Sequence, residues 1–468
     1  MTGPSIRNEF NSTDYFGPDG EFKPVSCARD LIDRYPVATT PATEGDTMYL
    51  QNGRQWLPNG EQILRDELWQ ILGDAASRRR VNEAVRAARG LSRTTRDELL
   101  GLEPHKVLVE NGIVDMLAED ADDPFEIDGN GPGTFTRVPV AYDSQATPER
   151  FDEFLSEVLH PDDVPIMWEL IGYCLYRGYP YQKAFMFLGD GANGKSTLLA
   201  ALREFLGVEN VATAELQTLA EDRFAAADLD GKLANIAPDI SDEGLEQTGT
   251  FKALTGGDRL RAERKYQDAY HFENHAKLIF SANAVPGADD LTHAYERRWL
   301  YFEFPNTFDA DDDDTVSQEE LLEAFRDEFP GILNVALVSF QDLYERGYFE
   351  DTVYMRTYDD AHERAINPAV QFVKDEIEAD PDAEVRISRA YDAYRVWCRE
   401  EGRPTQGAGH FENAVLNEYS PAEGKDPEDR RYRVWLGVRL CDDAADRADD
   451  ADHADVEDEV DTAQQATF

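Results

Sequence analysis

Lysine is the scarcest of the formally charged residues in this sequence of 468 residues. Only ten of the 46 basic residues are lysine, whereas aspartate and glutamate number 95, so the formal net charge is −49. Such a charge argues against binding to nucleic acid, because affinity for a polyanion comes largely from cationic side chains. It is also typical of proteins that remain soluble in molar salt, where charge is screened beyond about 3 Å. We therefore expect a haloarchaeal-type host, with a generic acidic protein that avoids nucleic acid as the alternative.

Cysteines and long apolar runs are scarce as well. The four cysteines are far apart and form no C-x-x-C pair, which argues against a zinc site and against a disulfide framework. No apolar run approaches the roughly 20 residues that a membrane span requires, and the first ten residues lack the apolar centre of a signal peptide. The sequence predicts a cytoplasmic protein without a membrane partner.

The length and the patterns predict an α/β protein of several domains. Asn52-Gly53, between two short strand-like runs, predicts a hairpin near the start. Apolar residues at three- and four-residue steps predict helices over residues 61–100 and 148–180. The expected segments are a flexible arm (1–25), a mixed α+β domain (26–147), a P-loop ATPase domain with leading helices (148–305), a helical lid segment (306–366), a winged-helix-like domain (367–441) and an acidic disordered tail (442–468).

The last predicted domain reads as helix, helix, strand. In its final strand, residues 431–440, the even positions are apolar from Tyr432 to Leu440. One interpretation is a basic and aromatic face for DNA, and the other is that the arginines only neutralise nearby acids. The odd positions carry Arg431, Arg433, Trp435 and Arg439, with Gly437 between the last two.

The most informative motif is GDGANGKST, which follows an apolar run typical of a buried strand, residues 184–188. It matches G-x-x-x-x-G-K-[ST], in which backbone N–H groups at a helix N-terminus surround phosphates. Lys195 would reach the β- and γ-phosphates of ATP and the Ser196 hydroxyl would bind Mg²⁺; the alternative is a glycine turn with a surface lysine. The residues expected to contact the nucleotide are Gly189, Asp190, Gly191, Ala192, Asn193, Gly194, Lys195, Ser196 and Thr197.

A phosphate loop needs a second acid at the end of another buried strand, to orient Mg²⁺ and water. The run 232–240 supplies such a strand, and Asp239 near its end is the first candidate. Asp242 and Glu243, just beyond, are the alternatives. Asn283 ends the next apolar run and could sense the γ-phosphate, although a turn residue is the simpler interpretation. Because six of the ten lysines lie between residues 183 and 277, this stretch has a use for ammonium groups.

Two adjacent arginines, Arg297 and Arg298, precede the apolar run WLYFEF. A guanidinium group stays charged at any ordinary pH and is suited to reaching a γ-phosphate from a neighbouring subunit. Two neighbouring arginines are also ordinary on a protein surface, so this role depends on the other motifs.

The ordered set GDGANGKST, LANIAPDISDE, FKALTGGD, RKY, KLIFSAN and ERRWLYFEFP resembles the phage and plasmid primase/helicase family. That family belongs to the superfamily 3 helicases, which include poxvirus-type helicase-primases. The resemblance implies an AAA+-like core in which Lys195 and Ser196 bind nucleotide. Asp239 takes the place of the second acid, although relatives commonly carry glutamate there. Asn283 becomes the sensor, and Arg298 or Arg297 the arginine finger.

The resemblance also implies a DNA-contacting hairpin within a ring, commonly a hexamer. Its candidate residues are Arg264, Lys265, Tyr266 and His271. The implied function is an ATP-dependent DNA helicase of virus or plasmid replication. Because no separate primase domain is visible, primer synthesis would belong to another polypeptide or to a longer parent chain. The alternative is an ATP-dependent switch that loads other proteins at an origin without unwinding DNA.

Overall fold

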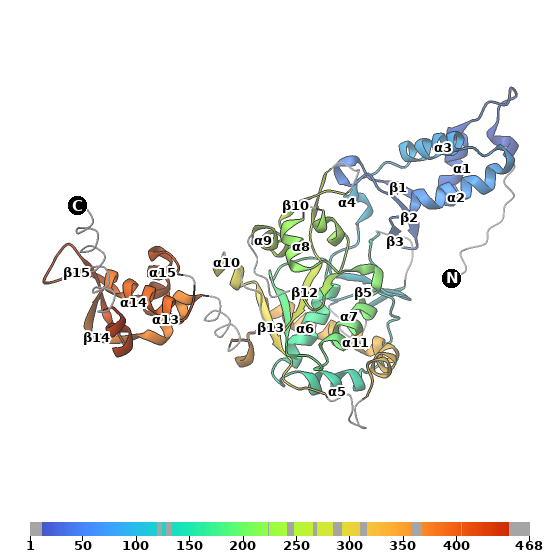
Figure 1. The fold of residues 1–468 in the computed structure, drawn as a ribbon. Coiled ribbons are helices and arrows are strands. Elements are labelled where there is room, and N and C mark those ends of the chain that lie inside the picture. The colour runs from blue at the N-terminus through green and yellow to red at the C-terminus, as the bar shows by residue number, and fades with distance from the viewer. Residues whose placement is uncertain are drawn as a thin grey trace, which may run out of the picture. The chain divides into compact units, whose positions relative to one another are not determined.

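The computed structural model describes residues 12–118, 124–127, 133–222, 224–240, 248–264, 269–283, 293–308, 316–356, 367–403 and 405–448 (Figure 1). The chain divides into two compact units, Met1–Met355 and Arg356–Phe468. Over the described ranges, none of the helices combines a bilayer-spanning length with a sufficiently apolar sequence.

The N-terminal part of the first unit packs three helices beside a small antiparallel sheet of order β1-β2-β3. Apolar residues at helical spacing, such as Leu64, Leu68 and Leu72, face a shared core. The predicted hairpin is confirmed, with Gly53 in its turn at φ +61°. The elements are η1 (Ser12–Tyr15), α1 (Pro24–Arg34), β1 (Val37–Thr39), η2 (Ala42–Glu44), β2 (Met48–Asn52), β3 (Gln55–Leu57), α2 (Gly60–Leu72), η3 (Gly73–Ala75), α3 (Arg78–Leu91) and α4 (Arg96–Leu99).

The described part of the expected flexible arm is ordered, which corrects that prediction for residues 12–25. Tyr15 is buried in the helical core, and Phe16 forms a β-bridge with Phe22. The rings of Phe16 and Phe22 lie 5.6 Å apart. These aromatic anchors outweigh the glycine and proline content on which the expectation was based.

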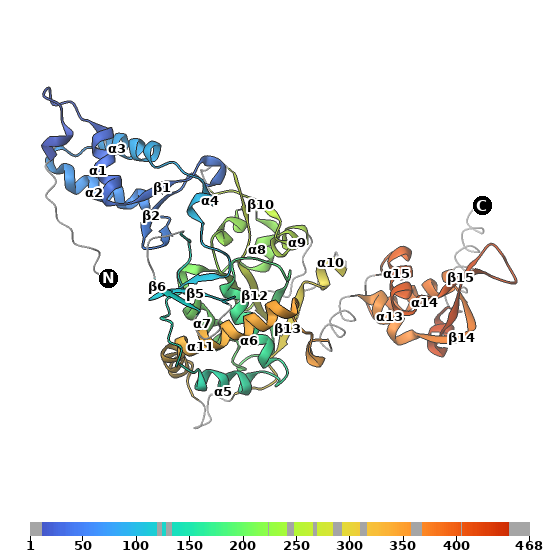
Figure 2. The same cartoon turned by 180° about the vertical axis from the view of Figure 1, so that it is seen from behind.

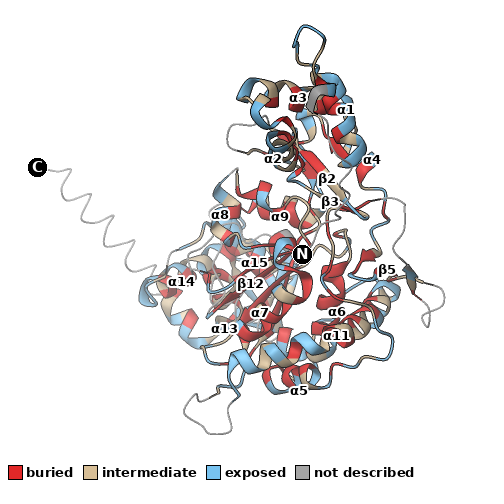
Figure 3. Ribbon diagram, turned by 90° about the vertical axis from the view of Figure 1, so that its right-hand side faces the viewer, coloured by how far each residue is buried: buried red, intermediate tan, exposed pale blue. Residues whose placement is uncertain are grey.

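A second antiparallel sheet, β4-β5-β6, leads into the larger domain of the same unit. That domain is centred on a five-stranded parallel sheet of order β13-β7-β12-β9-β8. Strands β7 and β12 are buried at every residue, and Figure 3 shows β12 in the colour of buried residues. The elements up to β9 are β4 (Lys106–Leu108), β5 (Gly112–Asp115), β6 (Phe125–Ile127), α5 (Glu149–Val158), α6 (Val164–Leu175), β7 (Ala184–Leu188), α7 (Lys195–Leu206), η4 (Val208–Asn210), β8 (Val211–Ala212), α8 (Leu216–Glu221), η5 (Ala225–Leu229) and β9 (Ala234–Ala237).

Between β9 and the last strand of this sheet, the chain forms a separate antiparallel ribbon of β10 and β11. The remaining elements of the first unit are α9 (Gly249–Gly256), β10 (Arg259–Ala262), β11 (Tyr270–Glu273), β12 (Lys277–Ala282), α10 (His293–Glu296), β13 (Trp299–Glu303) and α11 (Gln318–Arg346).

Helix α11 lies where a helical lid segment was expected. It packs against α6 and α7 (Figure 2), and its buried residues belong to the same core as the parallel sheet. Gly172 of α6 allows a close approach, because a Cβ there would lie 2.2 Å from the carbonyl oxygen of Ala336. In the structure this helix is therefore part of the main core of the first unit.

The second unit contains a three-stranded antiparallel sheet of order β14-β16-β15 packed with helices. The sequence predicted helix, helix, strand, and therefore missed one helix, strand β15 and strand β14. That strand is mostly exposed and acidic, so it lacks an alternating apolar pattern and depends on pairing with β16. The elements are α13 (Pro368–Glu376), β14 (Ile377–Arg386), α14 (Ile387–Glu400), α15 (Ala408–Tyr419), β15 (Ala422–Lys425) and β16 (Arg433–Leu440).

The basic and aromatic face predicted for the last strand is wrong in one respect. Trp435 is fully buried, whereas Leu436 is 40% exposed. Gly437 has φ +90°, and this irregularity shifts the alternation of side chains along β16. The exposed arginines have acidic partners, since Arg433 lies 2.8 Å from Glu423 and Arg439 lies 2.5 Å from Glu378. These ion pairs favour the interpretation in which the arginines neutralise acids.

The expected disordered tail begins as a helix, which corrects that prediction for residues 442–448. Ala444 and Ala448 are buried against the core of the second unit. Arg447, the tail's one basic residue, lies 2.9 Å from Glu376 and 2.8 Å from Glu400. Ala444 and Ala448 are four residues apart and therefore lie on the same face of this helix. Their burial and the two ion pairs of Arg447 stabilise the helix against the core.

Candidate functional site

A tight loop joins the buried strand β7 to helix α7. Gly189 has φ +151° and Gly194 has φ +90°, a region that residues with a Cβ rarely adopt. A Cβ at Gly189 would lie 2.2 Å from the side-chain nitrogen of Asn193, and one at Gly194 would lie 2.6 Å from Val158. Both glycines are therefore required by backbone conformation and by space. The loop turns the chain so that α7 begins directly above the end of β7.

Lys195 is the first residue of α7 and is only 4% exposed. Its ammonium group donates to the carbonyl oxygen of Gly189 at 2.5 Å and to Oδ1 of Asn193 at 3.1 Å. Burial lowers the pKa of Lys195, and the nearby carboxylates of Asp239 and Asp190 oppose that shift. The lysine is thus held inside the loop, close to acids rather than in solvent.

The chain that follows β13 braces the loop. The backbone N–H of Phe308 donates to the carbonyl oxygen of Ala192 at 2.7 Å, and that of Phe304 donates to Leu188 at 2.8 Å. The side chain of Asn193 donates to the carbonyl oxygen of Phe304 at 3.5 Å. These contacts fix the loop from the side opposite to α7.

Asp239 and Asn283 follow the carboxyl ends of β9 and β12 respectively. Asp239 has φ +49°, and its backbone N–H donates to the hydroxyl of Ser281 at 3.0 Å. The left-handed conformation is one that aspartate tolerates better than most residues, and the hydrogen bond ties the turn to β12. The alternatives Asp242 and Glu243 lie outside the described residues.

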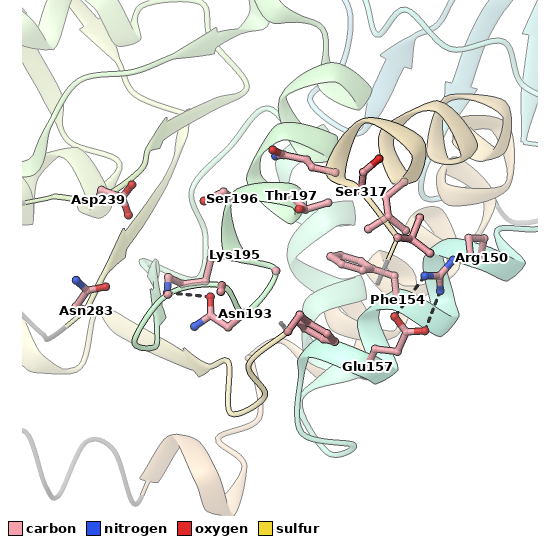
Figure 4. A pocket seen from close by; sticks show the side chains of 17 residues that line it. Arg150, Phe154, Glu157, Asn193, Lys195, Ser196, Thr197, Asp239, Asn283 and Ser317 are labelled. Atoms are coloured by element: carbon pink, nitrogen blue, oxygen red, sulfur yellow. Dashed lines mark hydrogen bonds and ion pairs between the residues drawn. The ribbon is translucent and has the colours of Figure 1, made fainter. Parts of the chain in front are cut away.

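Asp239, Asn283 and most residues of the loop line one cavity of about 700 Å³ (Figure 4). In that view Asp239 and Asn283 lie on one side of Lys195, and α5 lies on the other. Of the predicted nucleotide residues, Gly189 and Asp190 begin the loop, and the rest join the lining. The cavity is lined from the loop and strand ends by Gly191, Ala192, Asn193, Gly194, Lys195, Ser196, Thr197, Asp239 and Asn283.

The opposite wall was not predicted. It is formed by α5, by Phe308 and by the start of α11. Arg150 and Glu157 form an ion pair at 3.0 Å along this wall. The apolar spacing of α5 indicated only packing, so the second role of Phe154 had no separate signal in the sequence. The wall residues are Arg150, Phe154, Glu157, Phe308, Val316, Ser317, Gln318 and Leu321.

The oxygen atoms at this site suit a hard cation that is bound partly by its substrate. Ser196 offers a hydroxyl and Asp239 a carboxylate in the same cavity. In the part of the chain that the structure describes, no three His, Cys, Asp or Glu side chains form a metal cluster. Mg²⁺ typically binds through one or two carboxylates together with phosphates and water, so these residues fit Mg²⁺ that accompanies a nucleotide.

Arg297 and Arg298 do not reach this cavity. They precede β13, whose first residue pairs with Ala184 at the amino end of β7. Because the two strands are parallel, the arginines lie roughly 16 Å along the sheet from the loop at the carboxyl end. Arg297 is exposed and donates to Gln182 at 2.9 Å. Arg298 is only 8% exposed, and its burial lowers its pKa.

The predicted hairpin is the ribbon of β10 and β11. His271 is exposed on β11 and pairs with Arg261, and Arg259 lies on the same exposed face. Neither arginine was predicted, although Arg259-Leu260-Arg261-Ala262 alternates with the two-residue period of a strand. Arg264 instead turns toward Asp230, at 3.7 Å. Lys265 and Tyr266 lie outside the described residues.

Comparisons with known proteins give limited matches to this chain. Residues 187–298 match the model of a family described as "Family of unknown function (DUF5906)". That range begins in β7 and ends at Arg298, so it contains the loop, Asp239 and Asn283. The C-terminal region of NrS-1 is similar in solved apo structures. One covers 88% of this chain and 100% of its own, with a TM-score of 0.48 at 12% identity. A second covers 89% of this chain and 100% of its own, with a TM-score of 0.46 at 13% identity.

One curated relative adds a functional name. It is "Putative helicase L207/L206" of Acanthamoeba polyphaga mimivirus, which is 29% identical over 126 residues, or 25% of this chain. The match covers 13% of the length of that relative. The sequence similarity to a viral protein named as a helicase thus extends along 25% of this chain.

Proposed function

We propose that the protein is an ATP-dependent DNA helicase of the superfamily 3 type. The observation that carries this proposal is the convergence of a lysine, a hydroxyl, a carboxylate and an amide on one cavity. Lys195 and Ser196 come from the loop after β7, Asp239 follows β9, and Asn283 follows β12. This is the set of groups that ATP hydrolysis at a phosphate-binding loop requires.

The position of the cavity in the sheet supports a nucleotide site. From β7 the chain crosses to β8 at one edge of the sheet, whereas from β12 it crosses to β13 at the other edge. The connections from these adjacent strands leave in opposite directions, which creates a crevice at their carboxyl ends. Ligands of open parallel sheets bind at such crevices. The aromatic rings of Phe154 and Phe308 would then flank the base.

Each residue would have a separate role in hydrolysis. Lys195 would exchange its bonds to Gly189 and Asn193 for the β- and γ-phosphate oxygens, with little movement of its buried chain. Ser196 and Asp239 would hold Mg²⁺, which supplies charge neutralisation at the phosphates when bound. Asn283 would position the attacking water. Because Asp239 is one methylene shorter than glutamate, it suits metal binding better than direct activation of water.

The arginines support an assembly in which subunits share sites. Arg297 lies at the amino ends of the strands, whereas its own cavity lies at their carboxyl ends. In this proposal, Arg297 therefore completes the cavity of a neighbouring subunit. Its exposure fits that role better than the burial of Arg298. We propose a ring, with six subunits as the stoichiometry that the family resemblance implies.

DNA contact is proposed for the exposed face of the β10–β11 ribbon. Arg259, Arg261 and His271 supply the basic side chains of this face, where Arg259 pairs in register with Glu273 and Arg261 lies 3.1 Å from Glu263. The order helix, strand, helix, helix, strand, strand in the second unit supports a winged-helix module. A closed ring around one strand would retain DNA even when molar salt weakens each phosphate contact.

The test is strand displacement on forked DNA by the purified protein in molar KCl, together with ATP turnover and electron microscopy for rings. ATP-dependent displacement by rings is expected. ATP turnover without displacement would favour the alternative, an ATP-dependent loading switch, and absence of turnover would contradict both. Primer synthesis, where coupled, would belong to another polypeptide or to a longer parent chain.

A further inference from the structure

The carboxylate of Asp230 lies where three parts of the first unit meet. It follows η5 in the ATPase domain, and its side chain is only 4% exposed. Arg96, the first residue of α4 in the N-terminal part, donates to both carboxylate oxygens, at 2.9 Å and 2.5 Å. Arg264, just after β10, lies 3.7 Å from the same carboxylate. One acid thus joins the N-terminal part, the ATPase domain and the end of the ribbon.

Both arginines are held by more than the acid. The guanidinium of Arg96 lies 4.7 Å from the ring centroid of Phe135, and that of Arg264 lies 5.4 Å from the ring of Tyr270. Phe135 stacks on Tyr49 with ring centroids 4.6 Å apart. A planar guanidinium between a carboxylate and an aromatic face has a fixed orientation, so the connection is directional.

Close packing does not fill the junction around this acid. A cavity of about 480 Å³ is lined by Asp230, Arg96 and Arg264, by Tyr49 and Trp56 of the N-terminal part, and by Lys232 of the ATPase domain. Beside this cavity, the ion pairs of Asp230 connect the parts together with the stack of Tyr49 on Phe135 and the contact between η2 and β11. Such a joint can transmit a displacement or be released without disrupting a core.

We infer that Asp230 is a positioning residue that ties the β10–β11 ribbon to the N-terminal part, so that movement of the ribbon during turnover is transmitted to that part. This inference rests on the proposed function, because the ribbon is taken to move with DNA. Asp230 lies outside the nucleotide cavity and is not assigned a role in hydrolysis. Its loss would therefore separate ATP turnover from strand displacement.

The test compares the wild-type protein with Asp230→Asn, which keeps shape but removes the charge, and with Asp230→Glu as the rescuing variant. Asp228→Asn is the matched control, since Asp228 is exposed in the same segment. We expect Asp230→Asn to lower the base pairs displaced per ATP at least fivefold, with DNA-free ATP turnover within twofold of wild type. Asp230→Glu should restore part of the loss. Unchanged coupling in Asp230→Asn, or an equal loss of turnover and displacement, would overturn the inference.

A second measurement does not depend on helicase activity. Hydrogen–deuterium exchange of the ribbon amides, residues 259–262 and 270–273, should become faster in Asp230→Asn and stay unchanged in Asp228→Asn. Arg264→Gln, which removes only the ribbon arm, should give the same result if Asp230→Asn does not fold. If amide exchange of the ribbon is unaltered in both Asp230→Asn and Arg264→Gln, the inference is overturned. A wild type that hydrolyses ATP without displacing DNA would contradict the helicase proposal instead, and the exchange result would still decide the joint.

Discussion

The ammonium group of Lys195 lies 2.5 Å from the carbonyl oxygen of Gly189, so the last part of the loop is bonded to its first residue. The lysine is buried, and the carboxylates of Asp239 and Asp190 are near enough to oppose the effect of burial on its pKa. A lysine held in this way is positioned before any ligand binds, and it would lose little side-chain entropy when phosphate replaces the carbonyl.

Lys195→Ala should therefore reduce the kcat for ATP about 10²- to 10³-fold, as expected when one preorganised charge is removed from a transition state. Lys425→Ala, at an exposed position on β15, is the control and should not change kcat. Steady-state phosphate release measures both variants. Full turnover by Lys195→Ala would contradict every enzymatic role proposed for the site.

Asp239→Asn should lower kcat and raise the Mg²⁺ concentration needed for half-maximal turnover. Asparagine tolerates the left-handed backbone at φ +49°, so the change tests charge and not the turn. Asp239→Glu should retain Mg²⁺-dependent turnover, because it keeps a carboxylate. Magnesium titrations of the three proteins decide the matter, and an unchanged Mg²⁺ requirement in Asp239→Asn would transfer the role to another acid.

Arg297→Ala and Lys195→Ala should complement each other. Each variant alone is expected to be inactive, whereas in mixed rings about a quarter of the interfaces would combine an intact loop with an intact arginine. A mixture that stays inactive after subunit exchange would refute a finger at position 297. Arg298→Ala, by contrast, is expected to lower the melting temperature, because its side chain is buried near Gly256 at the end of α9 and near Asp258.

Gly172→Ala should destabilise the first unit by roughly 1–3 kcal/mol or more, since the added methyl group overlaps the backbone of α11. Gly90→Ala is the matched control. A Cβ at Gly90 in α3 meets no atom within 4 Å, so alanine there should stabilise its helix by about 0.5–1 kcal/mol. Opposite shifts in melting temperature are expected, and equal shifts would exclude close helix packing as the cause.

Lys277 should make stability depend on pH. It is fully buried and donates to the carbonyl oxygens of Tyr176 and His275, and burial lowers its pKa to about 7. Because the folded-state pKa lies below that of an unfolded lysine, the unfolded state binds more protons between these values. The free energy of unfolding should therefore rise with pH from about 7, by at most about 1.4 kcal/mol per pH unit.

Lys277→Met isolates this contribution. The stability of wild type minus that of the variant should increase between pH 7 and pH 9 in chemical denaturation, even though the variant leaves two carbonyl groups without their donor. A difference that stays constant over this range would show that the lysine has an ordinary pKa. Cys174 is the cysteine whose pKa Lys277 lowers, but burial raises that pKa to about 12, so its thiol stays protonated in the folded protein over this range.

The strand ends of the site could be predicted because each follows a continuous apolar run, as buried parallel strands do. For that reason the sequence placed Asp239 and Asn283 after strand ends, as the structure has them. The carboxyl ends of parallel strands lie at the same end of a sheet, so the two residues are neighbours. The wall formed by Phe154 and the start of α11 could not be predicted, because its residues also serve ordinary packing and capping. Likewise, the joint at Asp230 depends on Arg96, which is 134 residues away in sequence.

The retained lysines show how composition and structure are connected. Four of those between residues 183 and 277 donate to main-chain carbonyl oxygens: Lys183 to Trp299, Lys195 to Gly189, Lys232 to Glu209, and Lys277 to Tyr176. A compact ammonium group can approach such acceptors closely, and arginine bonds them elsewhere, since Arg177 donates to the carbonyl oxygens of Leu102 and Glu103. The sequence indicated that ammonium groups are needed here, but not that backbone oxygens are their partners.

The separation of Arg297 from its own cavity has a consequence for how the proposed ATP turnover would respond to dilution. If catalysis needs groups from two subunits, an isolated subunit carries two half-sites and no complete site. A linear oligomer likewise has one half-site without a partner at each end. Specific activity would then increase with protein concentration and level off only when the circle closes. Dilution alone would switch such a protein off, without any inhibitor.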